Sequence, residues 1–278
     1  MTPSPRRQVG LAQLSLVGTA PPDLVAIAAE AGFDFIGARV RPVTGTERAY
    51  NLQPGSPMLK ETLARMRDTG VTVKDIEFLL LDGSEQRDAW LRMMAAGQAL
   101  GASSLTVAGA DADASRLADT LARMTEDGQG FGIVPTLEPI SYQPVQSLRA
   151  AAELARQAGC QVVVDALHFN RFGGTQDQLA GSVDLVPLVQ LCDGPALRPA
   201  GREGLVAESR SERGVPGEGE FDLAALVAAF PAGTPVSVET PSDRRVAQLG
   251  GLGWARTLKA ASDAVLQAAD SLQKAGAK

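Results

Sequence analysis

Short apolar runs alternate with Ala-rich stretches of helical period along the whole chain. The runs are rich in Val, Leu and Ile, and most are short enough to form one strand each. They predict strands over residues 9–16, 33–40, 71–81, 104–109, 131–139, 160–167, 184–193 and 234–241. The stretches between them carry apolar residues three or four positions apart. They predict helices over residues 22–31, 56–69, 84–100, 111–126, 143–158, 174–181, 221–230 and 254–274.

Eight strand–helix pairs follow one another without a linker, which predicts a single (β/α)8 TIM barrel domain over residues 1–278. The alternative α/β fold is a doubly wound sheet. That fold usually carries a Gly-rich phosphate loop after its first strand. The segment "LSLVGTAPPDL" contains no such loop, so the barrel is favoured.

The composition of the chain limits the classes of protein to which it can belong. Of the 278 residues 45% are hydrophobic, which is enough for a full core, and the net charge is −6. A negative chain disfavours nucleic acid and anionic membranes as partners, since both need a basic face. No apolar run approaches the length of a membrane span, no signal peptide is evident, and two cysteines are too few for a disulfide framework. We therefore expect a soluble cytoplasmic protein, with homodimer formation left open.

Oxygen-bearing side chains stand at the ends of four consecutive predicted strands: Glu138, Asp165, Gln190 and Glu239. The carboxyl ends of the strands in a barrel meet at one rim. Carboxylates brought together there would repel one another, and a divalent cation would remove that conflict. A ligand set made only of oxygens favours Mn²⁺ or Mg²⁺ over Zn²⁺. Each acid alone could equally cap a helix or pair with an arginine.

Other candidate residues lie near the same rim. His168, the only histidine, follows Asp165 by three residues, and its ordinary pKa is the one nearest neutrality. Glu77 lies near the end of a strand, where it could bind a substrate hydroxyl or pair with an arginine. Arg39 could bind a substrate carboxylate or phosphate, or form a salt bridge instead. The long polar segment 194–220 is expected to be a loop on the catalytic face.

The motifs around Glu138, Asp165-x-x-His168, "RGVPGEGEFD" and Glu239 resemble those of the xylose-isomerase-like TIM-barrel superfamily. The sugar phosphate isomerase/epimerase branch is the most similar, and it includes ketose 3-epimerases, inosose dehydratases and 3-dehydroshikimate dehydratases. The resemblance implies one divalent metal ion on Glu138, Asp165, position 190 and Glu239. It also implies that Glu138 and Glu239 act as acid and base. His168 and Arg213 would then contact the substrate, with Arg213 in an exposed loop where its ion pairs add little stability.

This chain departs from the family at Gln190, where most members carry the histidine of "H-x-K-D". Some 3-dehydroshikimate dehydratases have glutamine at that position. The resemblance thus implies a metal-dependent isomerase or epimerase acting on a small polyhydroxy carbonyl compound, or on its phosphate. A metal-dependent dehydratase and a barrel without catalytic activity are the alternatives. The DNA-repair branch is disfavoured, because its trinuclear zinc site needs several histidines.

Overall fold

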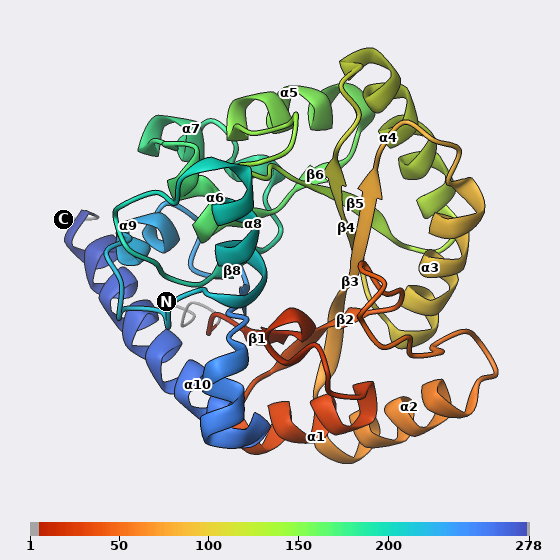
Figure 1. Cartoon of the computed structure of the whole chain (residues 1–278), viewed down its shortest axis with the longest axis horizontal. Coiled ribbons are helices and arrows are strands. Elements are labelled where there is room, and N and C mark those ends of the chain that lie inside the picture. Colours follow the sequence, from red (N-terminus) through yellow and green to blue (C-terminus); the bar gives the residue numbers. More distant parts are fainter. Residues whose placement is uncertain (1–5, 277–278) are drawn as a thin grey trace.

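The computed structural model describes residues 6–276, and a parallel sheet forms its centre (Figure 1). Its strands are β1 (Val9–Ala12), β2 (Phe35–Arg39), β3 (Thr72–Leu81), β4 (Ser104–Gly109), β5 (Val134–Glu138), β6 (Gln161–Val162), β7 (Val164–Asp165), β8 (Val189–Leu191) and β9 (Val236–Val238).

The strands follow one another around the sheet in the order β6-β5-β4-β3-β2-β1-β9-β8-β7. All of the pairs in this order are parallel. The two ends of the order, β6 and β7, are separated in the sequence only by Val163, so they are two halves of one interrupted strand. The sheet therefore curls into a nearly closed barrel with eight strand positions, as the sequence predicts.

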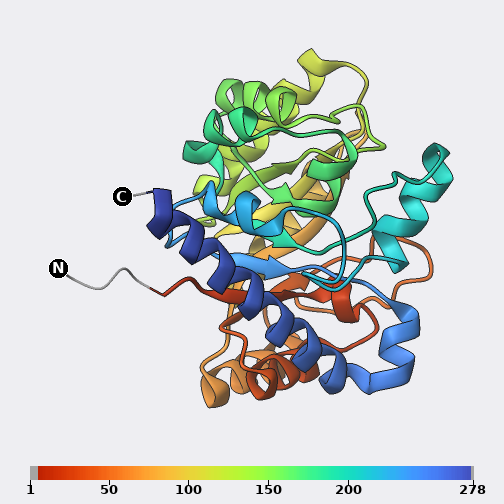
Figure 2. The same ribbon diagram turned by 90° about the vertical axis from the view of Figure 1, so that its left-hand side faces the viewer.

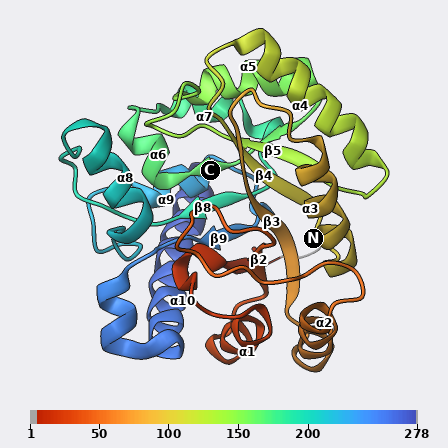
Figure 3. The same cartoon turned by 45° about the vertical axis from the view of Figure 1, so that its right-hand side comes forward.

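Helices surround the barrel on the outside (Figures 1 and 3). They are α1 (Pro21–Ala31), α2 (Pro57–Thr69), α3 (Arg87–Leu100), α4 (Ala114–Gln129), α5 (Leu148–Ala158), α6 (Ala166–Arg171), α7 (Gln176–Ala180), α8 (Gly201–Ser211), α9 (Leu223–Ala228) and α10 (Asp243–Gly276), with 3-10 turns at Gln13–Leu16 and Val183–Leu185. No helix within the described residues is long and apolar enough to cross a membrane.

Most of the hydrophobic core lies between this helical layer and the sheet. Trp90 of α3 and Trp254 of α10 are fully buried there, among Val, Leu, Ile and Ala from both layers. Small and apolar side chains on the inner helix faces let the helices pack closely against the strands. The core thus holds the strand ends in register at both rims of the barrel.

Several predicted segments were wrong in their bounds, among them strand 9–16, which ends at Ala12, and helix 254–274, which begins at Asp243. The predicted strand 160–167 ends at Asp165, because the Asp165 carboxylate accepts hydrogen bonds from the backbone N–H groups of Leu167 and His168 and so begins helix α6. The predicted strand 184–193 is reduced to β8. The predicted loop 194–220 contains α8, which stands out from the body of the barrel (Figure 2).

The inside of the barrel contains buried polar groups that sequence analysis did not single out. Asp75 of β3 is fully buried, and neither of its carboxylate oxygens has a hydrogen-bond partner within residues 6–276. Burial, together with the nearby charge of Glu239, raises the pKa of Asp75 to about 7. The Cβ of any side chain at Gly37 would lie 2.8 Å from oxygens of both Asp75 and Glu77, so glycine leaves space for this acid pair.

We expect Asp75→Asn to flatten the pH dependence of stability. The folded-state pKa of Asp75 lies above its ordinary value, so its contribution is fully present below about pH 4 and is lost as the pH rises toward 7. The wild type should lose roughly 2–4 kcal/mol more than the variant over that range. Urea unfolding at pH 4 to 8 measures this difference. Equal slopes for the two proteins would contradict the assigned burial of a protonated Asp75.

Candidate functional site

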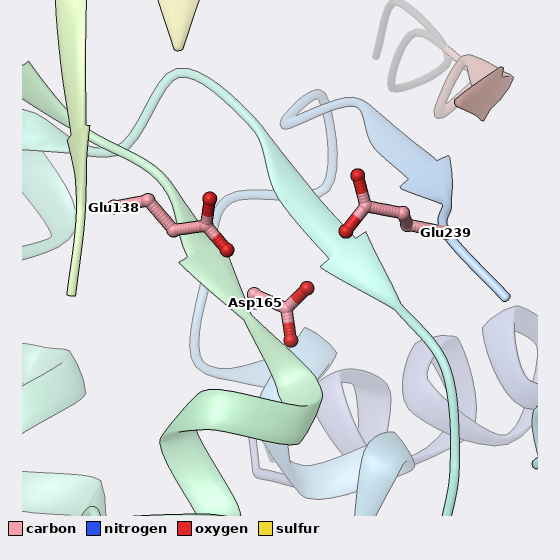
Figure 4. A group of neighbouring side chains, drawn as sticks. All are labelled: Glu138, Asp165 and Glu239. Atoms are coloured by element: carbon pink, nitrogen blue, oxygen red, sulfur yellow. The ribbon is translucent and has the colours of Figure 1, made fainter. Parts of the chain in front are cut away.

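Three carboxylates meet at the carboxyl ends of the strands, as the sequence predicts. Glu138 ends β5, Asp165 ends β7, and Glu239 follows β9. Each offers an oxygen within 4.8 Å of the others, and all three residues are buried. Figure 4 shows Glu138 and Glu239 pointing toward each other from opposite sides, with Asp165 between them. These strands bring together residues that lie far apart in the sequence, from Glu138 to Glu239.

Gln190, on β8, supplies a fourth polar group. Its Nε2 donates a hydrogen bond to Glu239 Oε1 over 3.1 Å. Its Oε1 is buried and has no hydrogen-bond partner within the described part of the chain. Leaving a buried carbonyl oxygen unpaired costs free energy, so an electropositive ligand beside it would be stabilising.

Arg213 binds two of the three carboxylates. Its Nη1 lies 2.6 Å from Asp165 Oδ2 and 3.0 Å from Glu239 Oε2, and it also donates to the Glu239 carbonyl oxygen. Its Nε donates to the carbonyl oxygen of Ser209 at the end of α8. Only 5% of Arg213 is exposed. The expectation of an exposed arginine with weak ion pairs is therefore wrong: α8 and the strand ends enclose it.

Burial and mutual repulsion dominate the electrostatics of the carboxylates. Burial, Asp165 and Glu239 raise the pKa of Glu138 well above its ordinary value. Burial also raises the pKa of Glu239 to about 8, although Arg213 opposes the shift. For Asp165 burial acts in the same direction, but Arg213 and His168 outweigh it and hold the pKa below its ordinary value. One guanidinium therefore does not neutralise the whole cluster.

His168 is buried beside Glu138. Its Nδ1 lies 3.2 Å from Ser141 Oγ, and its Nε2 lies 3.7 Å from Glu138 Oε1. Tyr142 packs edge-on against the imidazole ring. Burial lowers the pKa of His168 to about 4, so the ring is neutral at pH 7. The ordinary pKa of a histidine therefore does not apply to His168, and the neutral ring can act as a hydrogen-bond donor or a base.

Arg39 and Glu77 lie at the same site and pair with each other. Arg39 Nε is 3.5 Å from Glu77 Oε2, while its Nη1 is 2.8 Å from Glu47 Oε1. Burial and Asp75 raise the pKa of Glu77 to about 7. Of the alternatives that the sequence left open for these two side chains, the structure contains the ion pair. Both still border the cavity that could receive a substrate.

A cavity of about 360 Å³ opens above the carboxylates. Every residue predicted to bind substrate or to catalyse borders it: Arg39, Glu77, Glu138, His168, Arg213 and Glu239. Sequence analysis missed Tyr142, Ser209 and Glu47, which border the cavity as well. Tyr142 could have been found, because it comes shortly after Glu138 at a strand end. The other two lie in segments without a regular pattern.

The residues present fit a divalent cation. Three buried carboxylates share a volume in which Arg213 is the only residue that forms an ion pair with Asp165 or Glu239 among the described residues. The unpaired Gln190 oxygen adds a neutral ligand atom. This donor set contains oxygen and no sulfur, which suits a hard cation.

Comparison with known proteins agrees with this architecture. Residues 25–274 match the family model described as xylose isomerase-like TIM barrel. No protein of curated function matches the chain. Among solved structures, a xylose isomerase-like TIM barrel/4-hydroxyphenylpyruvate dioxygenase fusion protein is 25% identical, with a TM-score of 0.71. The match covers 86% of this chain but only 39% of the fusion protein, so this chain spans well under half of that relative.

Three further structures cover nearly all of both chains. The IolI protein, solved with a zinc atom, is 15% identical with a TM-score of 0.77, covering 94% of this chain and 98% of that one. An L-ribulose 3-epimerase is 15% identical with a TM-score of 0.71, covering 98% of each. The probable 3-DHS dehydratase AsbF from Bacillus anthracis is 14% identical with a TM-score of 0.69, covering 92% and 97%. At these identities the likeness concerns the fold. The family match extends over most of the chain and includes all four strand ends of the site, and so the chain belongs to the xylose isomerase-like TIM barrel family.

Proposed function

We propose that this chain is a divalent-metal-dependent isomerase or epimerase of a small polyhydroxy carbonyl compound. The observation that carries the proposal is the convergence of Glu138, Asp165 and Glu239 within 4.8 Å, beside an unpaired Gln190 oxygen. Glu138, Asp165, Gln190 and Glu239 would hold the ion. An enzymatic role has support at the level of the superfamily, since an epimerase shares the fold.

The two glutamates are placed to move a proton. Glu138 and Glu239 approach the centre of the site from opposite sides (Figure 4). Either carboxylate could remove the proton from the carbon next to a substrate carbonyl, and the other could return it on the opposite face. A bound divalent cation would supply the positive charge that lowers the energy of the enediolate formed between these two steps. His168, neutral and fixed by Ser141, would donate a hydrogen bond to a substrate oxygen.

The donor set favours Mn²⁺ or Mg²⁺, because carboxylate and amide oxygens are hard ligands. One structure with this fold, the IolI protein, holds zinc, which prefers nitrogen and sulfur donors where they are offered. In this chain His168 Nε2 faces Glu138, and Gln190 occupies the fourth position. Our proposal that only oxygen atoms would bind the metal ion rests on that arrangement.

A dehydratase is the second candidate, and the state of His168 favours it. A neutral imidazole beside the site can accept a proton from carbon and then return it to a departing hydroxyl group. The neutral ring is the form that can accept a proton, and burial keeps it neutral at pH 7 by lowering the pKa of His168 to about 4. The probable 3-DHS dehydratase AsbF shares the fold. Both candidates begin by removing a proton next to a carbonyl group.

An exchange assay tests the shared step and then separates the candidates. The protein with added Mn²⁺ would be incubated in D₂O with a panel of keto-polyols and followed by proton NMR. We expect deuterium to enter at the carbon next to the carbonyl in at least one compound. Appearance of an isomer identifies the first candidate, while strong ultraviolet absorbance from a conjugated product identifies the dehydratase. No exchange in any compound would favour the non-catalytic barrel.

We expect Gln190→His to change the metal preference. Imidazole is a softer ligand than an amide oxygen, so binding of Zn²⁺ or Co²⁺ should tighten relative to Mg²⁺. Calorimetric titration of each metal into the metal-free protein measures this directly. Gln178→His, on the outer helix α7, serves as the control and should leave the preference unchanged. An unchanged preference in the Gln190 variant would mean that this residue does not reach the ion.

A further inference from the structure

Three arginines border the substrate cavity, and they differ in their partners. Arg39 is paired with Glu47 and Glu77, and Arg213 is paired with Asp165 and Glu239. Arg210, in the last turn of α8, borders the same cavity but forms no ion pair or hydrogen bond through its side chain within residues 6–276. It is exposed at the mouth, so its guanidinium is available to a ligand.

A second feature is a groove beside the cavity, which is lined by arginines other than Arg210. The groove beside the cavity mouth shares Tyr142 and Gln143 with the cavity. Arg198 and Arg202 line this groove, and none of its lining residues is a carboxylate. The Arg202 guanidinium lies 5.7 Å from the centre of the ring of Tyr142, which borders both the groove and the cavity.

Arg210 at the cavity and Arg198 and Arg202 in the adjoining groove thus place positive charge near the cavity opening of a chain whose net charge is −6. The floor of the cavity carries carboxylates that would hold the metal ion, whereas Arg210 brings an unpaired positive charge to the cavity opening, so an anionic part of a substrate would be attracted there. Two further acidic residues, Glu47 and Asp243, also border the cavity; Glu47 is paired with Arg39, and neither forms an ion pair with Arg210. Of the three arginines that border the cavity, Arg210 is thus the one that pairs with no carboxylate within residues 6–276.

Tyr142 connects the two levels. Its ring contacts His168 on one side and Arg202 on the other, and its hydroxyl donates a hydrogen bond to Ser209 Oγ, next to Arg210. A ligand whose carbonyl group lies beside His168 would therefore extend past Tyr142 toward Arg210. From this geometry we infer that the substrate carries an anionic group, a carboxylate or a phosphate, which Arg210 binds at the mouth of the cavity.

This inference deepens the proposed function and rests on it for the position of the reacting carbonyl. A guanidinium binds carboxylate and phosphate groups with two parallel hydrogen bonds, which lysine does not reproduce. Arg210 would thus favour ligands that carry a negative charge. It would also orient the ligand without contacting the reacting carbon. The floor residues would select for the polyhydroxy carbonyl part.

Two matched probe pairs test the inference without knowledge of the natural substrate. The carboxylate pair is shikimate and its methyl ester, and the phosphate pair is fructose 6-phosphate and fructose. Calorimetric titration of the wild-type protein should show that one anionic probe binds at least about tenfold more tightly than its neutral partner, since a charge-assisted hydrogen bond contributes roughly that much. The pair that shows the difference identifies the anion.

In Arg210→Gln this preference should fall to less than about threefold while binding of the neutral probe stays unchanged. Arg210→Lys should retain only part of it. The matched control is Arg65→Gln, which removes the same charge from an exposed position on α2 and should keep the full preference. Equal binding of anionic and neutral probes by the wild type, or a full preference in Arg210→Gln, would overturn the inference.

Metal titration of the same proteins separates this inference from the proposed function. We expect the wild type and Arg210→Gln to bind one divalent ion with the same affinity, because Arg210 contacts none of the three carboxylates. If the wild type binds the metal ion but shows no anion preference, the inference about Arg210 is wrong and the proposed metal chemistry is unaffected. Anion preference without metal binding would remove the proposed metal chemistry and leave Arg210 as an anion-binding residue.

Discussion

Replacing Glu239 by glutamine should lower the rate of deuterium exchange by about 10²–10⁴-fold, because the variant loses a proton-transferring group. Glutamine has nearly the same shape, and its amide can still accept the hydrogen bond from Gln190 Nε2. Arg213 would remain paired with Asp165. We therefore expect the melting temperature to change little while the activity is lost.

Glu239 also bears on metal binding, so the variant should bind the ion more weakly as well. Exchange measured at saturating Mn²⁺ separates the two effects. Glu30→Gln is the matched control, since Glu30 pairs with Arg256 on the exposed surface, and its activity should equal that of the wild type. Exchange at the wild-type rate in Glu239→Gln with metal saturated would remove Glu239 from any acid–base role.

Replacing Arg213 by glutamine should destabilise the fold by about 3–5 kcal/mol, because removing one partner of a buried ion pair leaves an uncompensated charge. The charge in question is that of Asp165, whose Oδ2 would lose its cationic partner while its Oδ1 still caps α6. Urea unfolding of the metal-free protein measures the loss. Arg213 also joins α8 to the strand ends through Ser209, so the packing of α8 should loosen.

Arg245→Gln is the matched control for this variant. Arg245 pairs with Glu218 in a partly exposed position, where ion pairs contribute little to stability. A saturating divalent cation should restore part of the stability of Arg213→Gln, because it would compensate the same carboxylates. If Arg213→Gln and Arg245→Gln unfold at the same urea concentration, the buried ion pair does not stabilise the protein as we describe.

The barrel and the acidic cluster could be predicted from the sequence because both follow from regular patterns. Parallel strands that alternate with helices leave few possible folds, and their carboxyl ends must share one rim. Glu138, Asp165 and Glu239 each follow a run of apolar residues, so their positions on that rim could be inferred without coordinates. The residue at each strand end is a local property of the sequence.

The buried position of Arg213 could not be predicted in this way. Helix α8 buries Leu205 together with the polar residues Glu208 and Ser209, so its sequence lacks an apolar face. Glu208 is buried because it pairs with Arg171, which comes from a distant part of the chain. A polar segment that is held by long-range ion pairs has the composition of a loop. For the same reason the sequence did not indicate that this helix buries Arg213.

The protonation state of His168 was equally inaccessible. Its spacing from Asp165 suggests a pair of charged groups, but the backbone N–H of His168 binds the carboxylate while the ring turns toward Ser141. Burial then decides the pKa in favour of the neutral form. Side-chain direction and depth of burial, which set this outcome, depend on the tertiary structure.

Crystals of the protein soaked with Mn²⁺ and measured for anomalous scattering would test the metal site most directly. We predict one strong peak per chain, with oxygens of Glu138, Asp165, Gln190 and Glu239 at about 2.0–2.6 Å from it. A peak at another place, or carboxylates that remain without an ion at millimolar Mn²⁺, would contradict the account of this protein as a metal-dependent enzyme.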